Sequence, residues 1–205
     1  MANLAFTRVQ RECKEVVTSK EVEDTGILIE IQNDQLTSLK GIIRGPPDSP
    51  YENGLFTLDV HIPSGYPFQP PKVKFITRIW HPNVSSQTGL ICLDILKEQW
   101  AASLTLRTVL LSIQALLAAP EPKDPQDAVV ANQMMNNPAL FERTARFWTA
   151  HFATPTAGIG HLKKDPELDA KVHKIMEMGV SEDRAVNTLS CCGWDLTKAT
   201  DDLFT

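Results

Sequence analysis

The amino-acid sequence predicts an α+β fold, in which an antiparallel sheet carries flanking helices. Four short apolar runs that read as strands lie between residues 27 and 76, and Gly-, Pro- and Asn-bearing turns separate them. Apolar residues at helical spacing occupy residues 3–17 and return after residue 105. A run of strands followed by a run of helices is typical of the α+β class.

The first elements follow from local patterns. Residues 3–17 predict an amphipathic helix,. We expect its buried face to hold Phe6, Val9, Cys13, Val16 and Val17. We expect its charged residues to point away from that face: Arg8, Arg11, Glu12 and Lys14. The strand-like runs follow at 27–31, 39–44, 55–62 and 73–76, and their short connections favour an antiparallel meander,.

Periodicity fades between residues 76 and 104, and a long irregular stretch inside a compact domain is usually functional,. Thr105 is a candidate N-cap for a strongly apolar helix that stops before Pro120,. Asp127 is a candidate N-cap for a shorter helix, and Asn137-Pro138 is a start signal for another,.

A change in composition predicts two domains. Residues 154–163 are rich in small and turn-forming residues, which is typical of a linker between domains at 1–153 and 164–205,. The second domain shows three short helical patterns, which open at Asp165-Pro166, at Ser181 and at Asp195,.

The composition excludes several classes of protein. A net charge of −5 gives no basic excess for nucleic-acid binding, and no apolar run reaches transmembrane length,. The four cysteines show neither a disulfide framework nor a Cys-x-x-Cys metal motif,. We therefore expect a soluble protein of the cytosol or nucleus, with free thiols, no signal peptide and no membrane partner.

The irregular stretch contains His81-Pro82-Asn83 and, nine residues after Asn83, the lone Cys92. A cysteine thiolate is a good nucleophile, and an asparagine amide can stabilise the oxyanion that forms when an acyl group is attacked. Asn83 could equally order the loop through backbone hydrogen bonds. His81 allows a Cys-His interpretation or a structural one. The residues favour an enzyme that holds a thioester and protects it from water.

The motifs together are similar to the catalytic signature of ubiquitin-conjugating enzymes. The resemblance is carried by residues 66–73 (YPFQPPKV), by His81-Pro82-Asn83, by residues 89–96 (GLICLDIL) and by Trp100. Residues 164–205 resemble a ubiquitin-associated domain, with Met178-Gly179-Val180 where such domains usually have Met-Gly-Phe. A conjugating domain with such a tail resembles the huntingtin-interacting class of the family.

The resemblance implies a four-stranded antiparallel sheet with flanking helices, followed by a three-helix ubiquitin-associated domain. It implies that an activating enzyme, which consumes the ATP, loads ubiquitin onto Cys92, and that a lysine then attacks the thioester. Asn83 would stabilise the oxyanion. Asp124 would orient the lysine and accept its proton, with Asp127 as a rival that could instead cap a helix. His81 is structural in the family. No metal or organic cofactor is implied, and we expect a monomer.

Partner surfaces also follow from the resemblance. Arg8 and Arg11 would contact the activating enzyme, unless they are ordinary solvated charges. Phe68, Ala102 and Ser103 would contact ubiquitin ligases, although many relatives have Ser-Pro-Ala from position 101. The tail would bind ubiquitin or only dock on the catalytic domain. Its candidate binding residues are Met178, Gly179, Val180, Leu203 and Phe204.

The function that we expect is assembly of polyubiquitin chains of the type that targets proteins for degradation. Three rival functions remain open from the sequence. A cysteine hydrolase that acts on ubiquitin would need a positioned base, and neither His61 nor His81 has a recognisable orienting partner,. A non-catalytic ubiquitin-binding adaptor would not need Cys92. A conjugating enzyme for another ubiquitin-like protein would share the same chemistry.

Overall fold

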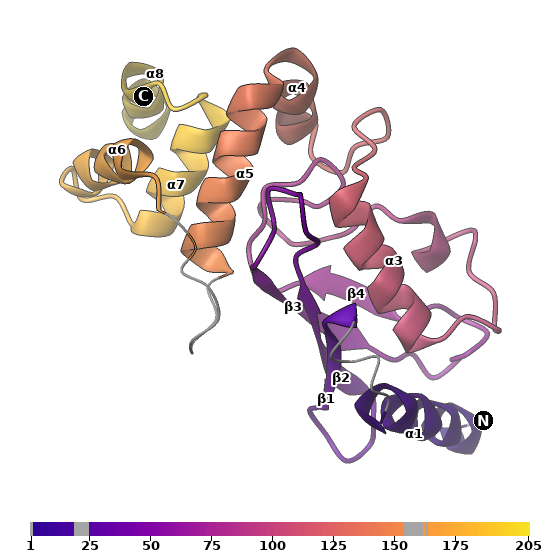
Figure 1. Ribbon diagram of the computed structural model, residues 1–205. Helices are drawn as coiled ribbons and strands as arrows, with labels where there is room; N and C mark the ends of the chain where they lie inside the picture. Colours follow the sequence, from indigo (N-terminus) through magenta and orange to yellow (C-terminus); the bar gives the residue numbers. More distant parts are fainter. Residues whose placement is uncertain (1, 19–24, 154–161, 163) are drawn as a thin grey trace.

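The computed structural model, which describes residues 2–18, 25–153, 162 and 164–205, contains a four-stranded antiparallel sheet with helices around it (Figure 1). Helix α1 (Ala2–Thr18) comes first, and the strands follow in the spatial order β1-β2-β3-β4. Their bounds are Ile27–Ile31, Ser38–Arg44, Leu55–His61 and Lys72–Phe75. The predicted α+β meander is therefore confirmed, with strand ends within a residue of those expected.

After the sheet the chain forms a 3₁₀ turn and then helices. Their bounds are Asp94–Leu96 for η1, Leu106–Ala118 for α3, Ala128–Asn136 for α4, Pro138–Phe152 for α5, Pro166–Met176 for α6, Glu182–Cys191 for α7 and Leu196–Phe204 for α8. The expected side-chain N-caps are present at Thr105, Asp127, Asn137, Asp165 and Asp195. Ser181 is the N-cap residue of α7, where the helix was predicted to open, but its side chain makes no capping hydrogen bond. Acidic residues in the first turn of α7 supply favourable charge instead,.

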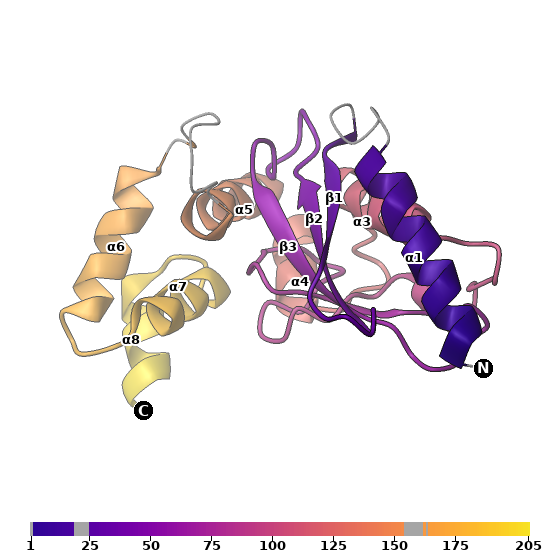
Figure 2. The same ribbon diagram turned by 90° about the horizontal axis from the view of Figure 1, so that it is seen from below.

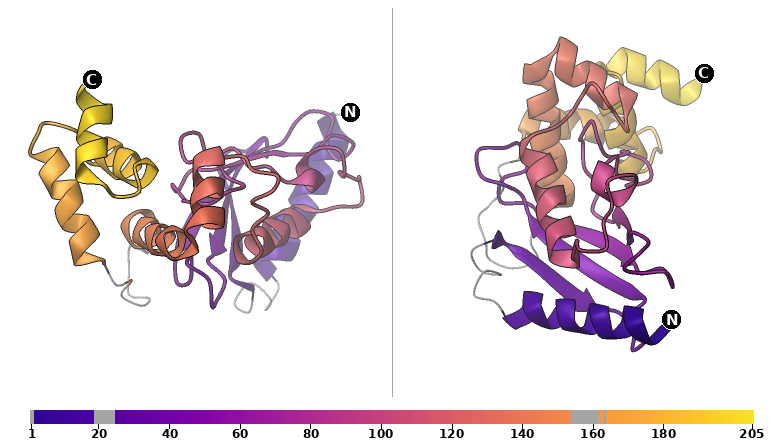
Figure 3. Two further views of the ribbon diagram at one scale, coloured as in Figure 1. Left: turned by 90° about the horizontal axis from the view of Figure 1, so that it is seen from above. Right: turned by 90° about the vertical axis from the view of Figure 1, so that its right-hand side faces the viewer.

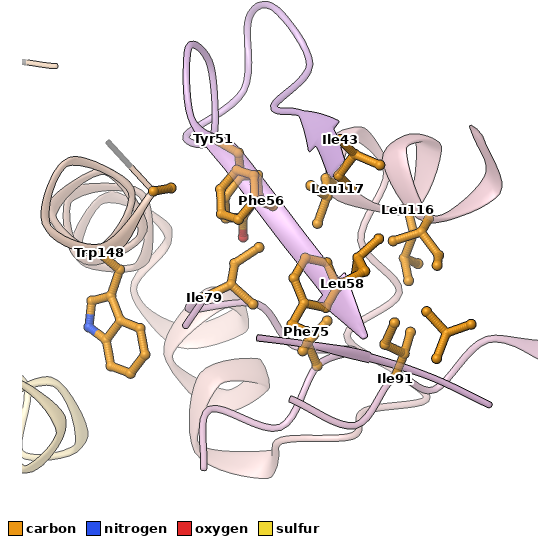
Figure 4. Packing of buried hydrophobic residues seen from close by; sticks show 14 of the residues in the cluster. Ile43, Tyr51, Phe56, Leu58, Phe75, Ile79, Ile91, Leu116, Leu117 and Trp148 are labelled. Atoms are coloured by element: carbon orange, nitrogen blue, oxygen red, sulfur yellow. The ribbon is translucent and has the colours of Figure 1, made fainter. Parts of the chain in front are cut away.

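The main core lies between the inner face of the sheet and α3. Alternate strand residues point inward, as in the pair Ile43–Phe56 across β2 and β3,. Figure 4 shows the strand side chains Phe56 and Leu58 facing Leu117 of α3. Helix α1 lies alongside β1 and also contacts α3 (Figure 2). This packing leaves the segment between β4 and α3 free to form an irregular loop region at one end of the sheet.

Helix α1 departs from the expected pattern at two residues. Phe6, which we predicted to be buried, is 38% exposed, and Ala5 occupies the buried position next to it. Glu12, which we predicted to point away from the core, is only 1% exposed. Val9 and Cys13 are buried as predicted, and burial raises the pKa of the Cys13 thiol to about 11. The side chain of Val17 lies outside the described residues.

Helices α6–α8, here called the C-terminal unit, pack on the face of α5 that is turned away from the sheet (Figures 1 and 3). The indole Nε1 of Trp194 donates to Thr144 Oγ1 at 2.9 Å, and the Trp194 ring meets Phe147 edge-on at 4.9 Å. Trp148 Nε1 donates to Ser190 Oγ at 2.8 Å. The buried residues of the unit thus form one continuous hydrophobic cluster with the main core.

Ion pairs surround this contact. Arg143 of α5 donates to both carboxylate oxygens of Asp165 at 2.6 and 3.0 Å, and to Glu167 at 2.7 Å. The Arg143 guanidinium lowers the pKa of both acidic side chains. The predicted linker at 154–163 lies outside the described residues except for residue 162. Among the helices that the structure describes, none is both long enough and apolar enough to cross a membrane.

Candidate active site

Two short backbone contacts bring the predicted active-site residues together. The His81-Pro82-Asn83 segment forms a turn in which Val84 N donates to His81 O at 3.1 Å. Cys92 N then donates to Asn83 O at 2.9 Å, so the half-buried cysteine lies next to the turn. The loop between them closes at Gly89, which has a φ of +74°. A Cβ there would lie 2.1 Å from Phe75 O, so this position requires glycine,.

The side chain of Asn83 is fully engaged with the loop that precedes α4. Its Nδ2 donates to Glu121 O and to Asp124 O, both at 2.9 Å. Its Oδ1 accepts from Glu121 N at 2.8 Å. Both amide hydrogens therefore have carbonyl partners, and Asn83 fixes the position of Asp124. This arrangement matches the loop-ordering interpretation of Asn83.

His81 is fully buried and uses both of its ring nitrogens. Nδ1 accepts from Asn83 N at 3.0 Å, which leaves Nε2 to donate to Leu116 O at 3.1 Å. Burial lowers the pKa of His81 to about 4, so the ring is neutral at physiological pH,. With neither nitrogen free, His81 cannot serve Cys92 as a base. It ties the turn to the end of α3.

Two oppositely charged side chains flank the thiol of Cys92. Lys97 Nζ lies 3.5 Å from Cys92 Sγ, and Asp124 Oδ2 lies 3.9 Å from the same sulfur. Asp127, the rival carboxylate, instead caps α4 and accepts from Ser86 N and Oγ at 3.0 and 2.7 Å. The structure thus places Asp124, and not Asp127, beside the sulfur. Sequence reasoning missed Lys97, although its position five residues after Cys92 was visible.

The predicted partner-contacting loops lie side by side. Trp100 Nε1 donates to Pro67 O at 2.8 Å, which ties the loop of Phe68 to the loop that carries Ala102 and Ser103. Phe68 is 73% exposed, so packing in the core does not explain its aromatic ring. Ala102 is half-buried and Ser103 is exposed. The three side chains that we expected to share a surface therefore belong to adjoining loops.

The two arginines of α1 differ. Arg11 is well exposed and lies 3.8 Å from Glu15. Arg8 is largely covered: its guanidinium pairs with Glu12 and donates to Leu104 O at 3.3 Å. The bond to Glu12 raises the pKa of Arg8. Arg8 therefore has a structural role in addition to any contact with a partner.

Glu12 joins three elements and was missed by sequence reasoning. Its Oε2 accepts from Tyr66 Oη at 2.7 Å and from Leu106 N, at the start of α3, at 2.9 Å. Burial and this hydrogen bond raise the pKa of Tyr66. Glu12 thus satisfies an N–H group at the beginning of α3 that has no partner within the helix. It holds α1, the Tyr66 loop and α3 together.

The candidate binding residues of the C-terminal unit are accessible despite docking. Met178 is 51% exposed and Phe204 is 59% exposed, whereas Val180 and Leu203 are half-buried. Gly179 is exposed and has a φ of +86°, which a side chain would strain,. In the described part of the chain, no group of three or more His, Cys, Asp or Glu side chains is arranged to hold a metal ion.

Comparison with known proteins identifies the family of this chain. The family model described as "Ubiquitin-conjugating enzyme" matches residues 8–149, and the chain belongs to this family. Its members are transferases that carry ubiquitin as a thioester and interact with ubiquitin, an activating enzyme and ubiquitin ligases. The tail lies beyond the matched residues.

Particular relatives match along the whole chain. The chain is 54% identical over 204 residues to the "Ubiquitin-conjugating enzyme E2-22 kDa" of Drosophila melanogaster, covering 100% of both proteins. It is 52% identical over 201 residues to the human "Ubiquitin-conjugating enzyme E2 K", covering 98% of both. A solved ubiquitin-conjugating domain of Toxoplasma gondii is 51% identical, with a TM-score of 0.67, covering 72% of this chain and 98% of that one.

Proposed function

We propose that Cys92 accepts ubiquitin from the activating enzyme as a thioester and that a lysine amine then collects it. The observation that carries the proposal is the position of the Cys92 sulfur, 3.5 Å from Lys97 Nζ and 3.9 Å from Asp124 Oδ2. Lys97 Nζ donates a hydrogen bond to this sulfur, and the thiolate of a cysteine is the form that attacks an acyl group,. The backbone bond to Asn83 holds the cysteine at the turn.

Asp124 serves the second step. An attacking lysine must first lose its proton, because only the neutral amine is a nucleophile. A free lysine has a pKa of about 10.4 and is therefore protonated at neutral pH. Partial desolvation in the site lowers that pKa, and a nearby carboxylate can orient the amine and accept its proton. The neutral nitrogen then adds to the thioester carbonyl, the C–S bond breaks, and the Cys92 thiolate leaves. The isopeptide product forms without a metal or an organic cofactor, and ATP is consumed by the activating enzyme.

Asn83 acts in this scheme mainly by holding the loop of Asp124. Direct contact with an oxyanion would require its Nδ2 to give up one of two carbonyl acceptors at 2.9 Å. We expect Asn83→Ala to form the thioester at the parent rate and to discharge it slowly. Loss of one oxyanion donor typically costs about 10²–10³ in rate. An Asn83→Ala enzyme that fails to charge would contradict both roles.

The C-terminal unit is proposed to bind ubiquitin and so to favour polyubiquitin chains of the degradation type. Met178 and Phe204 stay more than half exposed while the unit is docked on α5, which leaves apolar side chains for a partner. Weak binding suffices, because attachment to the catalytic domain raises the effective concentration of ubiquitin near Cys92. NMR titration of the full-length chain with ubiquitin tests this role. Absence of shifts around Met178 and Phe204 would remove it.

A charging assay tests the main proposal. The chain is incubated with activating enzyme, ATP and ubiquitin, and the products are resolved with and without reductant. The parent should form a reductant-labile adduct, Cys92→Ser a reductant-stable oxyester, and Cys92→Ala no adduct. Normal loading of Cys92→Ala would refute the assignment. Mass spectrometry of the chains formed then identifies their linkage.

Further assays separate the rival functions. A cysteine hydrolase would cleave a fluorogenic ubiquitin substrate without ATP, but His81, the candidate base, has both ring nitrogens occupied. An adaptor would bind ubiquitin without loading it. Use of another ubiquitin-like protein would appear as charging by that protein and its own activating enzyme. We further propose that the enzyme acts as a monomer in the cytosol or nucleus, where reduced thiols persist.

A further inference from the structure

The C-terminal unit reaches the segment that leads into the active-site loop. Trp80, which directly precedes His81, is fully buried, and its Nε1 donates to Gln133 Oε1 of α4 at 2.7 Å. The other end of the same amide, Gln133 Nε2, donates to Ser190 O of α7 at 3.3 Å. One side chain thus joins the loop to the C-terminal unit. An amide can do this because it is a donor at one end and an acceptor at the other.

A second contact runs parallel to the first. Arg78, two residues before Trp80, places Nη1 3.2 Å from Asp183 Oδ1 of α7. Its guanidinium lies 4.9 Å from the centre of the Trp148 ring, in the range of a cation–π contact,. The Trp148 ring lies 5.1 Å from that of Trp80. Residues 78–80 are therefore held by α4, α5 and α7 together.

From Trp80 the contacts continue to the reacting sulfur. The neighbouring His81 accepts from Asn83 N through Nδ1 at 3.0 Å, and Asn83 O accepts from Cys92 N at 2.9 Å. Active sites require their groups to be held within about 0.5 Å, and a misplacement of about 1 Å can cost about a hundredfold in rate. A shift of the Trp80 side chain would therefore reach the turn that positions Cys92.

We propose that Gln133 is a positioning residue that couples the C-terminal unit to the His81–Asn83 turn and so keeps the Cys92 site in its reactive geometry. The proposal rests on the proposed thioester function. It assigns to the unit a role in the rate of transfer that is separate from ubiquitin binding. The effect of each end of the amide on the transfer rate measures this coupling.

Two full-length variants separate the contributions of the two hydrogen bonds made by the Gln133 amide. Gln133→Met removes both hydrogen bonds, whereas Gln133→Glu keeps an acceptor for Trp80 but turns a carboxylate oxygen toward Ser190 O. Asn132→Ala, an exposed change on the same helix, is the control. Each enzyme is charged, and its thioester is discharged in a single turnover at increasing concentrations of free lysine. Thermal unfolding is measured in parallel.

We expect Gln133→Glu to show a maximal discharge rate about five- to tenfold lower, which corresponds to one lost hydrogen bond, and Gln133→Met, which loses both bonds, to show at least as large a decrease. The half-saturating lysine concentration and the Asn132→Ala control should match the parent. A Gln133→Glu enzyme at the parent rate would overturn the proposal, because the contact with α7 would then be dispensable. Charging of the parent, scored first on the same gels, reports on the proposed function separately.

A readout independent of activity uses Ser190→Ala in the full-length chain. This change removes the acceptor for Trp148 Nε1 and loosens α7. By NMR, we expect faster hydrogen exchange at the indole N–H of both Trp148 and Trp80. Faster exchange at Trp148 with unchanged exchange at Trp80 would overturn the coupling, and this result can be obtained even if a Gln133 variant does not fold.

Discussion

Replacing Glu12 by alanine should destabilise the fold by about 3–5 kcal/mol, because two buried donors lose their acceptor and Arg8 loses its partner. The Glu12 carboxylate is 1% exposed and accepts from Tyr66 Oη at 2.7 Å and from Leu106 N at 2.9 Å. Each buried donor left without an acceptor costs about 1–3 kcal/mol, so the two bonds alone account for most of the effect. The pair with Arg8 adds less, because the arginine remains partly exposed,.

Urea unfolding followed by circular dichroism measures this effect. The matched control is Glu15→Ala, since Glu15 lies on the same helix, is exposed and lies 3.8 Å from Arg11. The control should lose less than about 1 kcal/mol. Tyr66→Phe should also cost less in the Glu12→Ala background than in the parent, because the bond between them is already absent. A Glu12→Ala protein within about 1 kcal/mol of the control would refute the reasoning.

Three further perturbations have defined outcomes. The folded pKa of His81 is about 4, below its unfolded value, so its contribution to stability is complete above about pH 6.5 and is lost as pH falls toward 4,. Denaturation curves should show the difference between parent and His81→Gln shrinking by up to about 1.4 kcal/mol per pH unit in that window; a constant difference would contradict the buried neutral ring. Lys97→Ala removes the donor 3.5 Å from Cys92 Sγ and should slow charging of Cys92 by up to about fivefold, the equivalent of one lost hydrogen bond, and an unchanged charging rate would show that this contact does not assist the attack,. Trp194→Phe should cost about 1 kcal/mol in unfolding free energy by removing the donor to Thr144, and a neutral result would mean that water replaces that bond,.

The sequence was sufficient wherever the signal is local. Thr105, Asp127 and Asn137 begin helices because their short polar side chains accept from the N–H group three residues ahead, and that preference needs no distant partner,. The strands follow from alternation, which places every second residue in the core. Ser181 shows the limit of the rule, since position before a helix does not guarantee the capping bond.

Distant partners set what the sequence could not predict. The helical pattern predicts a surface position for Glu12, but its carboxylate accepts hydrogen bonds from donors 54 and 94 residues away. The sequence gives no sign that Ser190 and Gln133 differ from other helix residues. Their hydrogen bonds exist only because α7 is docked against α4 and α5. At the active site the motif predicted which residues meet, whereas the pairing of Asp124 with the cysteine sulfur, and of Asp127 with Ser86, required the folded loop.

The docking of α6–α8 on α5 has a practical consequence for the study of this enzyme. A chain cut after Ala153 would uncover Phe147 and the indole of Trp148, both almost wholly covered in the intact protein. Newly bared aromatic surface favours self-association, and α5 would lose the packing that these helices now supply. Loss of activity on truncation would then report damage to the remaining fold as well as the missing helices. Single substitutions in the full-length chain separate the role of these helices from damage to the remaining fold.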